Sequence, residues 1–282
     1  MGQYSPMNKL DLKKRAQVLA CLVEGNSIRA TVRMTGVAKN TVVKLLADVG
    51  AACAEYQDKT LRNLPCKRLQ CDEIWSFVYA KVRNVSRAKA APEGAGDAWT
   101  WTAIDADTKL VPCWMIGGRD AGYALDFMND LASRLSHRVQ LITDGHHAYL
   151  VAVQEAFGHQ IDWAQLAKLY GPKKGGEDGG PERFIGVKIG KVIGNPEPEA
   201  ISTSYVERQN LTMRMSMQRF TRLTNGFSKK LENLGYAVAL HFAYYNFARI
   251  HQSLRITPAM AAGISNHVWD LEEIAALADS DF

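Results

Sequence analysis

Residues 141–149, "LITDGHHAY", combine a short apolar run with an acid and a turn. The first three residues are typical of a buried strand, and Asp144 stands where that strand should end, just before Gly145. Two interpretations of Asp144 are open at this point. An aspartate in this place can cap the helix expected next, or its carboxylate can hold a metal ion.

The segments on either side alternate between strand and helix patterns. Strands are expected before this stretch at 68–82, 96–107 and 109–118, and a helical period follows them at 121–136. The stretch itself is followed by a helix at 148–158 and a short strand within 159–171. This order predicts an α/β layer built on a mixed sheet.

Residues 171–198 are rich in Gly, Pro and charge, which predicts a mobile loop, with a hairpin pattern in "FIGVKIGKVIG". The helical period returns at 203–220 and 232–251 and continues in most of the tail after Pro258. Pro65 marks the expected boundary between this α/β region and an all-α N-terminal region.

Residues 9–48 contain three short helical patterns separated by turns with glycine, which is typical of a helix-turn-helix. In that motif the early residues of the later helix reach DNA. These residues are all polar here: Lys39, Asn40, Thr41 and Lys44. A plain three-helix bundle with a solvated charged face explains the same pattern, so both interpretations stay open.

The composition bounds the function without selecting it. The 282 residues carry 34 Lys and Arg against 29 Asp and Glu, a net charge of +5 that permits a polyanionic partner. The sequence contains no run of 18 or more apolar residues, so no membrane span is expected, and the N-terminus lacks a signal-peptide pattern. Five scattered cysteines favour free thiols in a reducing cytoplasm over a disulfide scaffold.

Three acids stand at the edges of expected elements, far apart in the sequence. Asp72 lies in the first strand, Asp144 ends the fourth, and Glu207 lies in the first turn of a later helix. Each alone has an ordinary explanation, as a strand-edge charge, a helix cap or a first-turn acid favoured by the helix dipole. Together they form a set that can converge on Mg²⁺, which prefers carboxylate oxygens.

Five motifs follow one another over residues 71–264: "CDEIWSFV", "WTWTAIDADTKLVPCWMIG", "LITDGHHAY", "SYVERQNLTMRM" and "YYNFARIHQSLRITPAMAAGI". In this order they resemble a DDE transposase of the insertion sequence one family, within the integrase and transposase group with a ribonuclease-H-like fold. The interval from Asp144 to Glu207 is longer than is common in that group, and an insertion at about 171–198 accounts for the excess. Glu199 is the nearest competitor of Glu207.

The resemblance implies a ribonuclease-H-like mixed sheet flanked by helices, with Asp72, Asp144 and Glu207 as catalytic residues and ligands of two Mg²⁺ or Mn²⁺ ions. It also implies DNA cleavage at element ends, strand transfer into target DNA, and a homo-oligomer on DNA in the cytoplasm, associated with the nucleoid. The expected domains are a helix-turn-helix domain and linker at 1–64, a catalytic domain at 65–265 and a tail at 266–282.

Basic residues around the Glu207 helix are expected to grip DNA phosphates: Arg208, Arg214, Arg219 and Arg222. A solvated helix face explains them equally well, and the roles of His146 and His147 stay open. Two rival functions remain. One is a ribonuclease-H-like nuclease without strand transfer, and the other is a helix-turn-helix transcription regulator with an α/β sensor domain.

Overall fold

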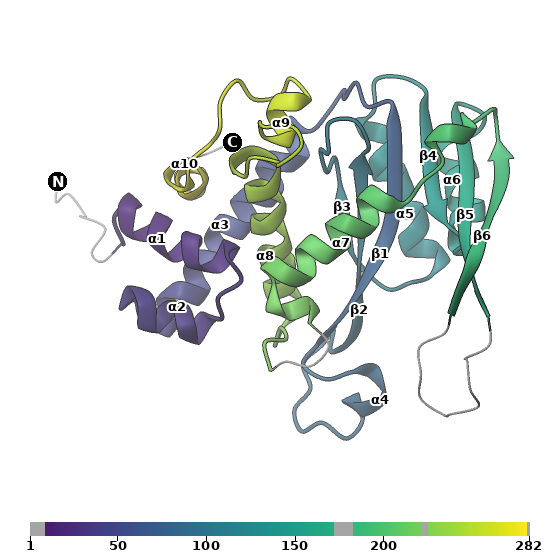
Figure 1. Ribbon diagram of the computed structural model, residues 1–282. Coiled ribbons are helices and arrows are strands. Elements are labelled where there is room, and N and C mark those ends of the chain that lie inside the picture. Colours follow the sequence, from purple (N-terminus) through teal and green to yellow (C-terminus); the bar gives the residue numbers. More distant parts are fainter. Residues whose placement is uncertain (1–8, 172–182, 222–224, 281–282) are drawn as a thin grey trace, which may run out of the picture. The chain divides into compact units, whose positions relative to one another are not determined.

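The structure is a computed structural model that describes residues 9–171, 183–221 and 225–280 (Figure 1). The chain forms two compact units. The helical unit comprises Met1–Thr60, Phe77–Gly96 and Met213–Phe282, and the sheet unit comprises Leu61–Ser76 and Asp97–Thr212.

A six-stranded mixed sheet with the order β3-β2-β1-β4-β5-β6 forms the core of the sheet unit. The strands are β1 (Arg68–Val78), β2 (Gly96–Asp105), β3 (Trp114–Gly117), β4 (Val139–Asp144), β5 (Ile161–Gly171) and β6 (Arg183–Ile193). β4 runs parallel to both β1 and β5, whereas β3 and β6 pair antiparallel with β2 and β5. The predicted mixed α/β sheet is therefore confirmed.

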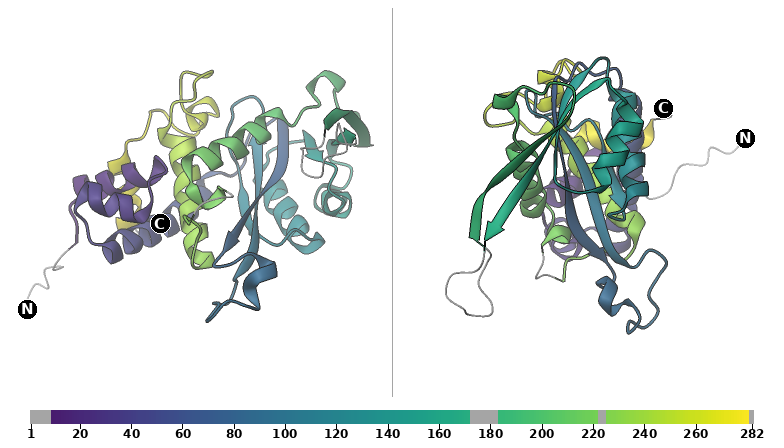
Figure 2. Two further views of the ribbon diagram at one scale, coloured as in Figure 1. Left: turned by 60° about the horizontal axis from the view of Figure 1, so that its bottom comes forward. Right: turned by 90° about the vertical axis from the view of Figure 1, so that its right-hand side faces the viewer.

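Helices cover both faces of this sheet. Figure 2 shows α5 (Ala121–Arg134) and α6 (Ala148–Phe157) together on one face and α7 (Ser204–Ser216) on the other. Beneath α5 and α6 the Trp101 ring meets Phe127 and Tyr149 at centroid distances of 5.9 and 5.5 Å. All three side chains are fully buried, so this aromatic cluster packs the two helices against β2, which carries Trp101.

Two expected segments of the sheet unit have different bounds in the structure. The predicted strand at 109–118 shrinks to β3, because Asp105 N bonds Leu110 O across a turn and Pro112 has no N–H to give to a ladder. The expected loop at 171–198 instead contributes β6, a full partner of β5, and residues 172–182 lie outside the described residues. Antiparallel pairing along β5 satisfies the backbone of a glycine-containing segment whose composition predicts a loop.

The helical unit is built from two helix groups that are distant in sequence. Its helices are α1 (Leu12–Val23), α2 (Ile28–Thr35), α3 (Lys39–Thr60), α4 (Val82–Val85), α8 (Leu231–Ala243), α9 (Pro258–Ala261) and α10 (Leu271–Ala276). Side chains of Asp11 and Ser27 cap α1 and α2, and Gly36 ends α2 with a φ of 71°, where glycine is favoured. Helices α1 and α2 therefore form where the sequence predicts them, and α3 begins where its predicted pattern begins.

Two predicted helix boundaries in this unit are wrong. The third helical pattern, expected within 9–48, does not end there, because α3 runs unbroken to Thr60 and packs along α8, with Gln57 Nε2 donating to Ala239 O at 3.1 Å. The helix expected at 203–220 ends at Ser216 and is followed by a 3₁₀ turn, Gln218–Phe220. The two compact units do not coincide with the expected domains, which meet at 64 and 265, because each unit combines segments that are distant in the sequence. The expected domain bounds remain predictions.

No helix in the described part of the chain is long and apolar enough to cross a membrane.

Candidate metal centre

Asp72 and Asp144 lie on neighbouring parallel strands at the same end of the sheet. β1 and β4 are in register from Arg68 opposite Gln140 to Cys71 opposite Thr143, which brings the next residues, Asp72 and Asp144, side by side. Asp144 ends β4, whereas β1 continues past Asp72 to Val78, so the parallel register of the two strands brings together two acids that are 72 positions apart. The expected proximity of these two side chains is confirmed.

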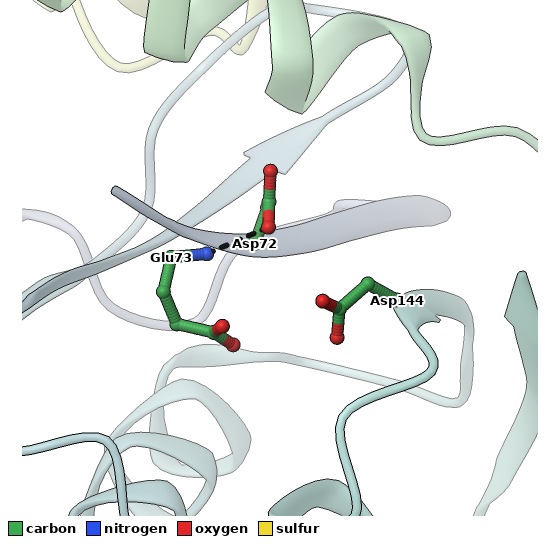
Figure 3. A group of neighbouring side chains, drawn as sticks. All are labelled: Asp72, Glu73 and Asp144. Carbon is green, nitrogen blue, oxygen red and sulfur yellow. Dashed lines mark hydrogen bonds between the residues drawn. The ribbon is translucent and has the colours of Figure 1, made fainter. Parts of the chain in front are cut away.

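A third carboxylate, Glu73, joins them. One oxygen of each of Asp72, Glu73 and Asp144 lies within 4.8 Å of the others (Figure 3). Asp72 and Glu73 are consecutive on a strand, so their side chains leave it on opposite faces, and Asp144 at the strand end faces both. The candidate centre therefore wraps around the edge of β1.

Arg119, just after β3, compensates part of the negative charge. Its Nε donates to Glu73 Oε2 at 3.0 Å, and its Nη2 lies 3.6 Å from Asp144 Oδ2. The guanidinium also lies 4.7 Å from the centre of the Trp99 ring, a cation–π contact that holds it in place. One cation thus faces three carboxylates, which leaves an excess of negative charge.

The pKa values record that excess. Burial, followed by the charge of Asp144, raises the pKa of Asp72 to about 6. The same two causes, in the same order, raise the pKa of Glu73 to about 7, although Tyr149 and Arg119 act to lower it. Since nearby like charges disfavour ionisation, a cation at this point would stabilise the ionised cluster.

The donors suit a hard divalent cation. All three side chains offer carboxylate oxygens, the ligands that Mg²⁺ and Mn²⁺ accept. Glu73 Oε1 is buried and has no hydrogen-bond partner in good geometry among the described residues, although the nearby Tyr149 hydroxyl acts to lower the pKa of Glu73. A buried carboxylate oxygen without a donor is costly unless something else, such as a metal ion, satisfies it.

Glu207, the predicted third ligand, lies outside this group of three carboxylates. It is in the first turn of α7, as expected, but its Oε2 accepts from Lys168 Nζ and its Oε1 from Thr203 Oγ1, both at 2.5 Å. Its charge nevertheless contributes to the raised pKa of Asp72. The structure therefore places Glu207 near the centre and gives it a cationic partner of its own.

Asn210, one turn after Glu207, makes the contact from α7 to the cluster. Its Nδ2 donates to Asp72 Oδ2 at 2.8 Å, and its own Oδ1 is buried with no partner among the described residues. Asp72 Oδ1 accepts from the backbone N–H of Glu73 at 2.9 Å. These two bonds fix the Asp72 carboxylate, and the sequence motif "VERQN" is the only signal that could have indicated Asn210.

Gln70, two residues before Asp72, positions the start of α7. Its Oε1 accepts from the backbone N–H groups of Tyr205 and Val206 at 2.9 and 3.1 Å, which are otherwise unsatisfied at a helix N-terminus. Thr203, which directly precedes α7, gives its hydroxyl to Glu207. The strand that carries Asp72 thus also holds the helix that carries Glu207.

The helix-cap interpretation of Asp144 is not what the structure shows. Asp144 Oδ1 accepts from the backbone N–H of His146 at 2.9 Å, whereas His147 occupies the N-cap position of α6. His146 Nδ1 accepts from Ala148 N at 2.9 Å, so its ring is held beside Asp144, and its pKa is lowered by burial and then by Arg119. His147 is exposed.

The predicted DNA-binding residues fall into two groups. Lys39, Asn40, Thr41 and Lys44 are all exposed at the start of α3, and Lys44 pairs with Asp48. Arg208 and Arg214 are exposed on α7, but Arg219 lies in the 3₁₀ turn after it and is half-buried. Arg222 lies outside the described residues.

Comparisons with known proteins find only low similarity, and only to solved structures. No family model matches the chain, and no curated protein does. The Mos1 strand transfer complex aligns with TM-score 0.34 and 12% identity over 100% of this chain and 82% of that chain. A piggyBac transposase synaptic complex with hairpin DNA aligns with TM-score 0.40 and 9% identity over 98% and 73%. The Mos1 mariner paired end complex with Mn aligns with TM-score 0.28 and 11% identity over 86% and 78%. These TM-scores are too low to carry an argument about fold or function.

Proposed function

We propose that this chain is a DDE transposase similar to the insertion sequence one family, which cuts DNA at element ends and joins them to target DNA with divalent metal ions. The observation that carries the proposal is the convergence of Asp72, Glu73 and Asp144 at one edge of the sheet. Residues from two strands meet there with an excess of negative charge, and the sequence motifs around them are those that resemble the transposase group. The sheet is, in this proposal, ribonuclease-H-like.

Asp72 and Asp144 would hold the metal ions, Glu73 would add a third carboxylate, and Glu207 is proposed to complete the set. The ions, when bound, would activate the attacking oxygen and stabilise the leaving oxygen of a phosphodiester. The protein's own part is to keep these ligands fixed. Asn210 orients Asp72, and Arg119 orients Glu73 and keeps part of the charge compensated.

Glu207 can serve as a ligand only if it exchanges Lys168 for the metal, because Lys168 Nζ occupies its Oε2. If a metal ion replaced Lys168 at Glu207, Lys168 could then contact a DNA phosphate, because the phosphate is anionic like the carboxylate. This exchange is part of the proposal. Glu73 Oε1 needs no such exchange to bind a metal ion, because it has no hydrogen-bond partner among the described residues.

The exposed polar residues at the start of α3 are proposed to bind DNA in a helix-turn-helix manner, with Arg208 and Arg214 as phosphate contacts on α7. An oligomer on paired DNA ends in the cytoplasm is the assembly this function requires. The wider alternative, a nuclease that cuts without joining, uses the same carboxylates and differs only in the second reaction step.

The test uses labelled duplexes from the two flanks of the gene, a supercoiled target plasmid and Mg²⁺ or Mn²⁺. Nicked labelled ends and joined products should both appear, and both should vanish with EDTA and in Asp72→Asn and Asp144→Asn. Asp126→Asn, an exposed acid on α5, is the matched control and should behave as wild type. Cleavage without joined product would establish the nuclease instead, and metal-independent or absent cleavage would overturn the proposal.

A further inference from the structure

The helical unit contains a cavity of about 650 Å³ to which no residue of the carboxylate centre contributes. Its described walls come from the turn between α1 and α2, the start of α3, residues 216–219 and 225–229, and α8. A cavity of this size is typical of small-molecule sites, which span roughly 300–1,000 Å³.

Among the described residues, four cationic side chains line the cavity: Arg29, Lys39, Arg219 and Lys229. No aspartate or glutamate is among the described residues that line it. Four like charges around one hollow repel one another, and an anion placed between them would relieve that repulsion. The lining therefore selects for a negatively charged ligand.

Arg219 is the cation that most needs such a partner. Its side chain is half-buried, and its Nη1 donates to the neutral hydroxyl of Ser228 at 2.6 Å. It makes no ion pair with a carboxylate among the described residues, and burial alone lowers its pKa to about 10. A guanidinium that loses water without gaining a counter-charge is unfavourable, so its retention here points to an anion that pairs with it.

The rest of the lining is suited to a flat heterocycle. Leu46, Met217 and Leu240 supply apolar surface, and Phe227 supplies an aromatic ring with Lys229 Nζ 3.5 Å from its centre. Three asparagines are among the described residues that line the cavity: Asn26, whose Nδ2 donates to Cys21 O, Asn225 and Asn233. A nucleotide is recognised by three kinds of group: aromatic and apolar surface that stacks on the base, amides that bond the base edge, and arginine that pairs with the phosphate.

We propose that this cavity binds one nucleotide, with its phosphate at Arg219 and its base against Phe227 and the apolar wall. The nucleotide can belong to an unpaired DNA end or be free in solution, and the chemistry of recognition is the same. The inference does not depend on the carboxylate centre or on the transposase function, because all the lining residues belong to the helical unit.

Isothermal titration calorimetry of the full chain tests the proposal with defined probes. The probes are 2′-deoxyadenosine 5′-monophosphate, deoxyadenosine, inorganic phosphate, and a 5′-phosphorylated oligonucleotide in single-stranded and blunt duplex forms. The monophosphate should bind at least about tenfold more tightly than either deoxyadenosine or inorganic phosphate, because each of these lacks one half of the contacts. A single strand that binds more tightly than the monophosphate would identify a DNA end as the source, and equal affinities would identify a free nucleotide.

Variants assign the binding to the cavity. Arg219→Met should weaken the monophosphate by at least about tenfold, Arg219→Lys should weaken it less, and Lys230→Met, an exposed lysine next to Lys229 that does not line the cavity, should leave it unchanged. Thermal unfolding should show Arg219→Met folded, and the monophosphate should raise the melting temperatures of wild type and Lys230→Met more than that of Arg219→Met.

Asp72→Asn should keep full nucleotide binding, so failure of the transposase function and failure of this inference are separable. Inorganic phosphate that binds as tightly as the monophosphate would reduce the site to an anion site and overturn the nucleotide assignment. Binding that Arg219→Met does not change, or no binding by any probe, would overturn the whole proposal.

Discussion

Asp72→Asn should make the sheet unit more stable at pH 8 and leave its stability nearly unchanged at pH 4. The pKa of Asp72 rises from 3.8 to about 6 in the folded protein. Because the folded protein holds this proton to a higher pH than the unfolded chain does, stability falls as the pH rises from about 4 to about 6 and stays lower above that. Asparagine carries no charge at any pH, so the variant escapes this loss.

The magnitude follows from the same pKa values. A rise from 3.8 to about 6 corresponds to about 3 kcal/mol of unfavourable free energy above pH 6. The carboxylate accepts two hydrogen bonds, from Glu73 N and Asn210 Nδ2, and an asparagine oxygen that keeps only one of them gives back about 1 kcal/mol. The expected gain is therefore about 2 kcal/mol at pH 8.

Urea unfolding followed by tryptophan fluorescence, in EDTA at pH 4 and pH 8, measures this difference. Asp126→Asn, exposed on α5, should stay within about 0.5 kcal/mol of wild type at both pH values. Asp72→Asn that is less stable than wild type at pH 8, or that gains the same stability at pH 4 as at pH 8, would show that the ionised cluster is not electrostatically strained.

Three further changes test other parts of the structure. Glu207→Gln should leave folding and DNA binding intact while suppressing cleavage and joining in the plasmid assay, whereas Glu199→Gln should do little; the reverse pattern would reject Glu207 as a ligand. Lys39→Gln should weaken DNA binding and lower the slope of log affinity against log salt by about 1 if it contacts a phosphate, and an unchanged slope would show that it does not. Gly50→Ala should destabilise the helical unit by about 1–3 kcal/mol, seen as a lower melting temperature, because its Cβ would lie 2.6 Å from the Tyr236 carbonyl oxygen; a higher melting temperature, as expected for alanine in an open helix, would contradict that packing.

The two aspartates could be predicted because their signal is local. The apolar strand that ends in Asp144 before a turn marks a sheet edge, whereas Asp72 lies inside its strand and is indicated by the motif "CDEIWSFV". The mixed sheet follows from the same patterns. The periodicity of these segments predicts the strands without any knowledge of contacts between residues that are distant in the sequence.

Glu73 could not be found in this way. Alternation along a strand predicts that the neighbour of Asp72 points to the opposite face, which argues against a shared site. The two carboxylates meet only because Asp144 sits at the strand end and faces both sides. Arg119 is equally hidden, since its partners come from β1 and β4 and lie far from it in sequence.

The remaining errors have one cause, which is tertiary pairing that overrides local composition. The glycines of β6 predict a loop, and pairing with β5 makes a strand of it. Contacts with α8 extend α3 to Thr60, and Gln70 from β1 caps α7 in place of the residues that precede that helix. None of these partners is adjacent in the sequence, so no local pattern contains them.

The most direct test of the central claim is a crystal of the protein soaked in Mn²⁺ and measured at the manganese absorption edge. Anomalous density is expected between Asp72, Glu73 and Asp144, within coordination distance of their oxygens, and should be lost in Asp144→Asn. Density elsewhere, or no density while Arg119 keeps its contacts with Glu73 and Asp144, would contradict the assignment of this edge as a metal centre.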